Sequence, residues 1–383
     1  MTTNISPTGR GRHLLDAHDP AELLAEARLC LREPPSDCLI LASTGGLETP
    51  AMITRSSLTD LLAPGGGADL ERHLALMRER GGSALHALIV IGDGYQRLLE
   101  PVTEEVLRRA GTTVLEAVQT LGPAPFGLLS LRGAASSSCW ELSRSRRDDT
   151  LRLSHTGPLR PFSDTRAAAT AVLVGRPIPR PERADPRLRE IGLGLRLPAP
   201  DLASDEDPGA LFAAARDALE TLGGGAGELT DPETMTKCEQ LAPLLSAIAV
   251  DRLHWELLAQ CVEHGGTTAI DRESLLQALV SDAQWVPHED VCAGGRWYVA
   301  LEKLRLIAAS ATEGASSGER GTARSAWRAL TALLVLLAWW NHRFATAGRL
   351  VDELWDREPD STLAPLLSRM TDTPIFPAWW PST

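Results

Sequence analysis

The chain has 383 residues, which is too long for one ordinary hydrophobic core and predicts two domains. Its hydrophobic content of 43% and charged content of 23% are typical of a soluble globular protein. The 50 acidic residues outnumber the 38 lysines and arginines, which gives a net charge of −12. This charge excludes a general nucleic-acid-binding protein, because neutralising phosphates requires a basic surface.

The cysteines and the apolar runs predict a cytoplasmic protein with reduced thiols. Six cysteines are sparse in a chain of this length, and "MTTNISPTGRGRHLL" lacks the apolar core of a secretory signal. The longest uninterrupted apolar run, Ala332 to Trp340, has nine residues, about half of what a bilayer requires. We therefore expect neither a membrane nor a nucleic acid as a partner, and no cofactor.

The first half of the chain alternates predicted helices and strands. A helix that begins at Asp19 and Pro20 leads to the strand "CLILAS", and the helix of "ADLERHLALMRER" leads to the aliphatic strand "ALIVIGDG". A helix from Val102 to Ala110 is expected to end at Gly111, before the strand-like "TTVLEAVQ". Two edge strands, "FGLLSLRG" and "CWELSRS", and the helix of "SDTRAAATAVLVGRP" follow. This alternation predicts an α/β fold with a mainly parallel sheet flanked by helices.

The second half of the chain is predicted to be helical. An exposed linker rich in Pro, Asp and Arg runs from Arg176 to Pro208, and helices fill most of the remainder. A flexible loop, "ATEGASSGERG", is expected before the last helices. The expected domains are therefore an α/β domain of residues 1–200, with its linker from about residue 176, and a helical domain of residues 201–383.

The last helices have the pattern of a tetratricopeptide-like hairpin. One helix is predicted over Trp327 to Trp340 and a second over Phe344 to Arg357, with a third short helix from Ser361 to Met370. Ala347 and Pro359 have the separation of the small residue and the proline in such a hairpin. Only one such unit is present in the sequence, so a full repeat array is not expected.

Three stretches together resemble an actinobacterial family known as domain of unknown function 4192. They are "DPAELLAEARLCLREPPSDCLIL", "AAATAVLVGRPIPRPERA" and "LLAWWNHRFATAGRLVDELWDREPDSTLAPLL", and their order and separation carry the resemblance. The family's Cys-rich patch is reduced here to Cys139 in "SSCWELSRSRRDD", and its Gly-Asp pair between the last helices is "NHR". The resemblance implies a fold and no reaction.

A possible zinc-binding pattern consists of Cys261, His264, His288 and Cys292. Two Cys and two His are a set of ligands that holds tetrahedral zinc. The alternative is a buried Cys261 on a helix that His264 caps, with His288 and Cys292 in a loop. Because the two pairs are not Cys-x2-Cys knuckles, we favour the alternative and expect no metal. The sequence does not determine whether the four residues converge.

A ligand crevice is expected where parallel strands end. Asp93 follows the aliphatic strand, and Ser43 and Thr44 follow the strand before it. Together with Arg132 they have groups suited to a phosphate or another polar ligand. The alternative is that these residues only form turns and loops. The chain contains no Walker loop, no Gly-x-Ser-x-Gly elbow and no His-Glu-x-x-His motif.

The segment "TDTPIFPAWWPST" contains prolines that prevent a helix and side chains that are too apolar to be left in water. We expect it to fold back onto the last helices, and the alternative is an exposed anchor for a partner or a second copy. The residues expected in this docking or partner contact are Trp339, Trp340, Trp355, Phe376, Trp379 and Trp380.

Two functions follow from these observations. The favoured one is a non-enzymatic module that binds a protein partner or regulates it. The second is a small-ligand-binding protein or an enzyme that uses the crevice at the strand ends. The sequence identifies neither a substrate, nor a partner, nor an oligomeric state, and it leaves open whether the protein is an enzyme.

Overall fold

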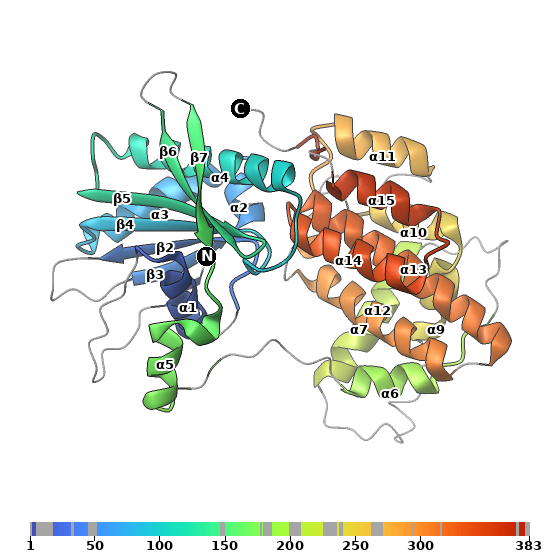
Figure 1. Cartoon of the computed structure of the whole chain (residues 1–383). Coiled ribbons are helices and arrows are strands. Elements are labelled where there is room, and N and C mark those ends of the chain that lie inside the picture. The colour runs from blue at the N-terminus through green and yellow to red at the C-terminus, as the bar shows by residue number, and fades with distance from the viewer. Residues whose placement is uncertain are drawn as a thin grey trace.

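The computed structural model shows a β-sheet beside a layer of helices (Figure 1). It describes residues 2–4, 18–31, 34–44, 52–145, 150–176, 178, 186–198, 208–224, 236, 240–261, 271–292, 295–314, 316–372 and 375–379. The strands are β1 (Thr2–Asn4), β2 (Cys38–Thr44), β3 (Met52–Ser57), β4 (Ala84–Val90), β5 (Leu128–Ala135), β6 (Ser138–Arg144) and β7 (Leu151–Pro158).

The sheet is mixed rather than mainly parallel. Its strand order is β1-β3-β2-β4-β5-β6-β7, and only β4 and β5 pair in parallel, whereas the other neighbours pair antiparallel. The prediction of a mainly parallel sheet is therefore wrong. It overlooked β3 and β7, and it assumed that β2 and β4 run in the same direction. In fact Cys38 of β2 pairs with Val90 of β4, and Thr44 pairs with Ala84.

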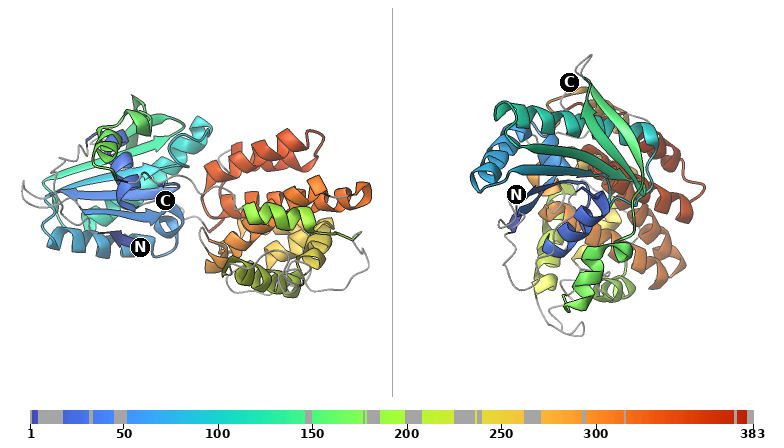
Figure 2. Two further views of the ribbon diagram at one scale, coloured as in Figure 1. Left: turned by 90° about the horizontal axis from the view of Figure 1, so that it is seen from below. Right: turned by 60° about the vertical axis from the view of Figure 1, so that its left-hand side comes forward.

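Helices cover both faces of the sheet (Figures 1 and 2). One face packs leucines such as Leu39 and Leu41 against α2, α3 and α4, and the other packs Ile40 and Val90 against α1. Alternation of side chains along each strand produces these two apolar faces. The helices around the sheet are α1 (Pro20–Leu31), α2 (Leu58–Leu62), α3 (Gly66–Glu79), α4 (Glu100–Thr120), η1 (Phe162–Asp164) and α5 (Arg166–Leu173).

Helix α4 passes through Gly111 without a break. The predicted helix end at Gly111 and the predicted strand "TTVLEAVQ" are therefore wrong. Val114 and Ala117 continue the buried stripe of α4 at helical spacing. Gly111 allows close packing instead, because a β-carbon there would lie 2.7 Å from the Cδ2 atoms of both Leu142 and Leu151.

The C-terminal part of the described chain is helical. Its elements are α6 (Pro186–Gly194), α7 (Pro208–Gly224), α9 (Leu241–Ile248), α10 (Asp251–Ala259), α11 (Arg272–Ser281), η2 (Glu289–Val291), α12 (Arg296–Gly314), α13 (Ser317–Trp340), α14 (Phe344–Arg357) and α15 (Leu363–Asp372). No strand of the sheet comes from beyond residue 230 in the described ranges, as predicted. None of the described helices combines the length and hydropathy that a membrane crossing requires.

Two segments expected to be irregular contain helices. The linker between Arg176 and Pro208 includes α6, which packs against α12 and joins it through an ion pair between Arg189 and Glu313 at 2.8 Å. The flexible loop predicted before the last helices is mostly helical, because α12 extends to Gly314 and α13 begins at Ser317. The Glu319 carboxylate accepts a hydrogen bond from the Ser316 N–H at 3.1 Å, as in a capping box. The boundary between two domains near residue 200 stays a prediction.

Candidate functional site

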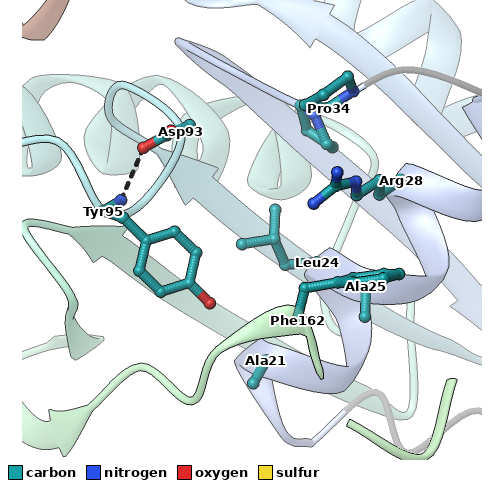
Figure 3. A pocket seen from close by; sticks show the side chains of 9 residues that line it. Ala21, Leu24, Ala25, Arg28, Pro34, Asp93, Tyr95 and Phe162 are labelled. Atoms are coloured by element: carbon teal, nitrogen blue, oxygen red, sulfur yellow. Dashed lines mark hydrogen bonds between the residues drawn. The ribbon is translucent and has the colours of Figure 1, made fainter. Parts of the chain in front are cut away.

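A small pocket of about 70 Å³ lies at the carboxyl end of β4 (Figure 3). Four segments of the chain form it: helix α1, the two prolines that follow α1, the turn after β4, and η1. The lining residues are Ala21, Leu24, Ala25, Arg28, Pro34, Pro35, Asp93, Tyr95 and Phe162. It is the pocket that contains Asp93, one of the residues predicted to contact a ligand.

The turn after β4 fixes the orientation of Asp93 and Tyr95. The Oδ1 atom of Asp93 accepts hydrogen bonds from the N–H groups of Tyr95 and Gln96, at 2.9 and 3.0 Å. The Tyr95 hydroxyl donates to the carbonyl oxygen of Arg160, which precedes η1. Burial raises the pKa of Tyr95 to about 12, so this hydroxyl remains a donor at neutral pH. Tyr95 thereby ties the turn after β4 to the segment that carries Phe162.

Arg28 supplies a positive charge to the pocket. Its guanidinium carbon lies 4.5 Å from the centre of the Phe162 ring, a cation–π arrangement. Figure 3 shows the guanidinium and the Asp93 carboxylate on opposite sides of the pocket, with the Tyr95 ring and Leu24 between them. The pocket therefore offers one charged group of each sign above an apolar floor.

The other predicted ligand residues do not join Asp93. Ser43 and Thr44 pair with the first residues of β4, whereas Asp93 follows its last residue, so they lie at opposite ends of the strands. Arg132 lies within β5 opposite Leu88, and its Nε donates to the Ser130 hydroxyl at 3.2 Å. The shared crevice is not formed, because β2 runs antiparallel to β4.

A buried polar contact next to this pocket joins the sheet to the C-terminal helices α6 to α15, which we call the helical layer. Asp37, which precedes β2, is fully enclosed, and its Oδ2 lies 3.7 Å from the Nε of Arg343. The Thr346 hydroxyl donates to the same oxygen at 3.3 Å. The Gly92 N–H donates to Asp37 Oδ1 at 2.7 Å. We call Asp37, Gly92, Arg343 and Thr346 the junction.

The Asp37 carboxyl group of the junction is shielded from bulk water, and the Arg343 side chain is mostly buried. Burial raises the pKa of Asp37, and the Arg343 guanidinium and the Gly92 amide only partly offset this. Burial also raises the pKa of Glu302 on α12, against Arg343 and Arg305. Burial alone would lower the pKa of Arg343, but Tyr298, Asp37 and Glu302 outweigh it, so Arg343 stays charged. One guanidinium therefore faces two carboxyl groups.

The residues of the zinc pattern are only partly described. The His288 N–H donates to the Cys261 carbonyl oxygen at 2.8 Å, so these two backbones are adjacent. The Cys261 thiol is buried, contacts the Leu257 carbonyl oxygen at 3.3 Å, and has its pKa raised by burial to about 12. Within the described ranges, no three His, Cys, Asp or Glu side chains are arranged to hold a metal. His264 lies outside those ranges.

Residues 375–379 fold back onto the last helices. The indole N–H of Trp379 donates to the Trp340 carbonyl oxygen at 3.1 Å, and that of Trp339 donates to the Ile375 carbonyl oxygen at 3.0 Å. The Phe376 ring lies 5.4 Å from that of Phe344 and under the guanidinium of Arg109 on α4. Of the residues expected in this contact, Trp355 is 37% exposed on α14 and Trp380 lies outside the described residues.

The end of α5 exposes three consecutive large apolar side chains. Val172, Leu173 and Val174 are 65%, 85% and 62% exposed, whereas Ala168 and Ala171 of the same helix are buried. Figure 1 shows α5 projecting from the edge of the molecule. We call Val172, Leu173 and Val174 the α5 tip. Exposed apolar groups that are contiguous mark interaction sites more often than single ones do.

Sequence reasoning missed the junction and most of the pocket. Asp37 lies between the predicted helix and the strand "CLILAS", and Gly92 lies in "ALIVIGDG", and no motif marks either residue. The junction residues Arg343 and Thr346 carry no motif. The exposed "VLV" before Gly175 lies in a segment for which the sequence predicted only a helix. Comparison with known proteins adds nothing further, because no family model, curated protein or solved structure matches the chain.

Proposed function

We propose that this protein is a non-enzymatic module that binds a protein partner through the surface formed by α1 and α5. The observation that carries this proposal is the exposure of the α5 tip. At roughly 25 cal/mol per Å² of apolar surface, covering three such side chains contributes a few kcal/mol to binding.

The partner that fits this surface is a protein held transiently. Three side chains cover far less than the roughly 800 Å² per partner that a stable complex buries. Beside α5, Arg160 forms an ion pair with Asp19, and Arg176 forms one with Glu26 of α1. The positive charges of these two arginines are therefore already paired with carboxylates. An apolar groove on the partner is therefore the complementary feature. A second copy of the chain is an outcome that the experiment distinguishes.

The test places a photo-activated crosslinking residue at Leu173 in living cells. The matched control places it at Leu76 on α3, which is 54% exposed and lies on the opposite face of the sheet. We expect adducts of discrete mass from position 173 only, and their loss when Val172→Asp and Val174→Asp are added. Equal adducts from both positions, or none from 173, would reject the proposal, and an adduct of twice the chain's mass would identify a second copy.

A second candidate function is recognition of a small ligand in the pocket. The observation that favours it is the presence of the Arg28 guanidinium and the Asp93 carboxylate on opposite sides of the cavity. Within the chain, Asp93 also accepts hydrogen bonds from the Tyr95 and Gln96 N–H groups, and the Tyr95 hydroxyl donates to the Arg160 carbonyl oxygen. A small zwitterion that raises the melting temperature of the native protein, but not of Arg28→Met, would support this function. A panel of such compounds without effect on either protein would remove it.

Three expectations from the sequence belong to the same proposal. Membership of the family known as domain of unknown function 4192 is supported by the order of three stretches along the chain. A tetratricopeptide-like hairpin is supported by helices α13 and α14, with Ala347 buried. A cytoplasmic location is supported by the sparseness of cysteines, of which the 383-residue chain has six.

A further inference from the structure

Two short segments, 34–37 and 92–95, face the pocket on one side and the helical layer on the other. Pro34, Pro35, Asp93 and Tyr95 line the pocket. Their neighbours Asp37 and Gly92 contact Arg343, Ala345 and Thr346 of the helical layer. No more than two residues therefore separate each pocket wall from the junction.

Reciprocal hydrogen bonds make the two segments move as one piece. The Asp37 N–H donates to the Gly92 carbonyl oxygen at 2.8 Å, and the Gly92 N–H donates to Asp37 Oδ1 at 2.7 Å. A displacement of either segment breaks one of these buried bonds unless the other segment follows. Each such loss leaves a buried polar group without its hydrogen-bond partner, which is unfavourable.

The helical layer packs closely against segments 34–37 and 92–95. A β-carbon at Gly92 would lie 2.9 Å from the Cβ atom of Ala345, so the two backbones approach as closely as glycine permits. Arg343 lies in the turn between α13 and α14, and Thr346 lies in the first turn of α14. The side chains of both residues contact Asp37. Any shift of the segment that joins α13 to α14 therefore changes the contacts of Asp37 and Gly92.

Three features indicate that the junction has a second arrangement. Asp37 and His342 both have positive φ, at 42° and 60°, a conformation that costs free energy in residues other than glycine. The Tyr298 hydroxyl is buried without a hydrogen-bond partner in the described structure, and the Arg343 guanidinium carbon lies 5.2 Å from the centre of the Tyr298 ring. The Arg343 guanidinium lies 3.7 Å from Asp37, and the Glu302 carboxyl group on α12 is a second group that raises the pKa of Arg343.

We propose that the Asp37–Gly92 bridge couples the pocket to the helical layer, so that filling the pocket and closing the junction favour each other. In the closed arrangement Arg343 pairs with Asp37 and the two pocket walls are held together. In the open arrangement Arg343 pairs with Glu302 and the Tyr298 hydroxyl, and the walls separate. Coupling of this kind is reciprocal, so a change at either end is transmitted to the other.

The chain offers a direct readout, because it contains only two tyrosines. Tyr95 lines the pocket and Tyr298 lies under Arg343 at the junction. Incorporation of fluorotyrosine into the full chain therefore gives two ¹⁹F NMR resonances, one for each end of the proposed coupling. They are assigned with Tyr95→Phe and Tyr298→Phe.

The first arm perturbs the junction and observes the pocket. We expect Thr346→Val, which removes one 3.3 Å hydrogen bond and no charge, to shift or broaden the resonances of both tyrosines. Arg343→Met is expected to do so more strongly. The matched control is Arg189→Met, which removes the 2.8 Å ion pair with Glu313 between α6 and α12 and is expected to leave Tyr95 unchanged. An unchanged Tyr95 resonance in Thr346→Val and in folded Arg343→Met would overturn the proposal.

The second arm perturbs the pocket and observes the junction. Phe162→Ala removes the ring that carries the Arg28 guanidinium, and we expect it to shift the Tyr298 resonance. Leu76→Ser, on the exposed side of α3 across the sheet, is the control and is expected to move neither resonance. A response of Tyr95 alone to Phe162→Ala counts against coupling. The proposal treats the pocket as part of the binding surface, but neither arm needs a partner, so it fails independently of the proposed function.

Discussion

The hydroxyl of Thr59 donates a 2.6 Å hydrogen bond to the carbonyl oxygen of Asn341, a residue 282 positions further along the chain. Both groups are buried, Thr59 in α2 beside the sheet and Asn341 at the end of α13. Together with the junction, this bond shows that the sheet and the helical layer meet through polar groups as well as through apolar ones.

Replacement of Thr59 by Val tests the strength of this contact. Thr59→Val keeps the shape and leaves the Asn341 carbonyl without this donor, so we expect the free energy of unfolding to fall by about 1–2 kcal/mol. Urea denaturation followed by Trp fluorescence measures it. The control is Thr112→Val, whose exposed hydroxyl bonds only to the Arg108 carbonyl oxygen of its own helix. A loss of equal size in both variants would contradict the prediction.

Truncation of Trp379 tests the docking of residues 375–379. The side chain is 4% exposed, and its ring centre lies 4.3 Å from that of His342. We expect Trp379→Ala to lower the free energy of unfolding by about 3–5 kcal/mol, whereas Trp355→Ala has a much smaller effect because Trp355 is more exposed. Deleting residues 374–383 should lower the melting temperature of a monomeric sample. Unchanged melting together with lost self-association would mean that the segment binds a partner instead.

The pH dependence of stability tests the burial of Asp37. Its folded-state pKa is raised by burial, so the native state binds this proton more tightly than the unfolded chain does. The resulting stabilisation is present below the unfolded pKa of about 3.9 and is lost as the pH rises through the raised pKa. The stability of the native protein relative to Asp37→Asn is therefore expected to fall as the pH rises across that window, in urea titrations at stepped pH.

Asp271 provides a control of opposite sign for this measurement. Hydrogen bonds from Ser274 and from the backbone N–H groups at the start of α11 lower the pKa of Asp271. Its contribution to stability is present above its unfolded pKa and is lost as the pH falls through the lowered pKa. The stability of the native protein relative to Asp271→Asn should therefore rise with pH. The same slope in both pairs would show that Asp37 is not desolvated.

Replacement of Gly92 tests the close approach at the junction. Gly92 has φ of +59°, and a β-carbon there meets Ala345 at 2.9 Å. We expect Gly92→Ala to lower the free energy of unfolding by about 2–3 kcal/mol, because strain and overlap add. Gly348→Ala in α14 is the matched control, since nothing lies within 4 Å and alanine favours a helix by about 0.5–1 kcal/mol. Calorimetry should show a lower melting temperature for Gly92→Ala and a higher one for Gly348→Ala.

The elements that the sequence predicted correctly have strong local signals. The aliphatic run before Gly92 forms β4, and Phe344–Arg357 forms α14 with the bounds predicted from its apolar spacing. The error at Gly111 has a local cause as well. Glycine ends many helices, but here it allows Leu142 and Leu151 to pack closely against α4.

The features that the sequence did not predict depend on contacts between residues that are far apart along the chain. An apolar strand such as β2 has the same sequence pattern whether it runs parallel or antiparallel to β4, so the separation of Ser43 from Asp93 was not predictable. Asp37 and Arg343 meet only after the sheet and the helical layer have packed together. Neither residue belongs to a motif, so one sequence contains no sign of their pairing.

The placement of the strands along the chain has a consequence for biosynthesis. Every described strand lies between residues 2 and 158, and α6 to α15 all follow. A nascent chain leaving the ribosome can therefore complete the pairing of the sheet while the helical layer is still being translated. Asp37 and Gly92 would then already be bridged when Arg343 emerges, so the early-made sheet serves as a template on which the late-made helices assemble.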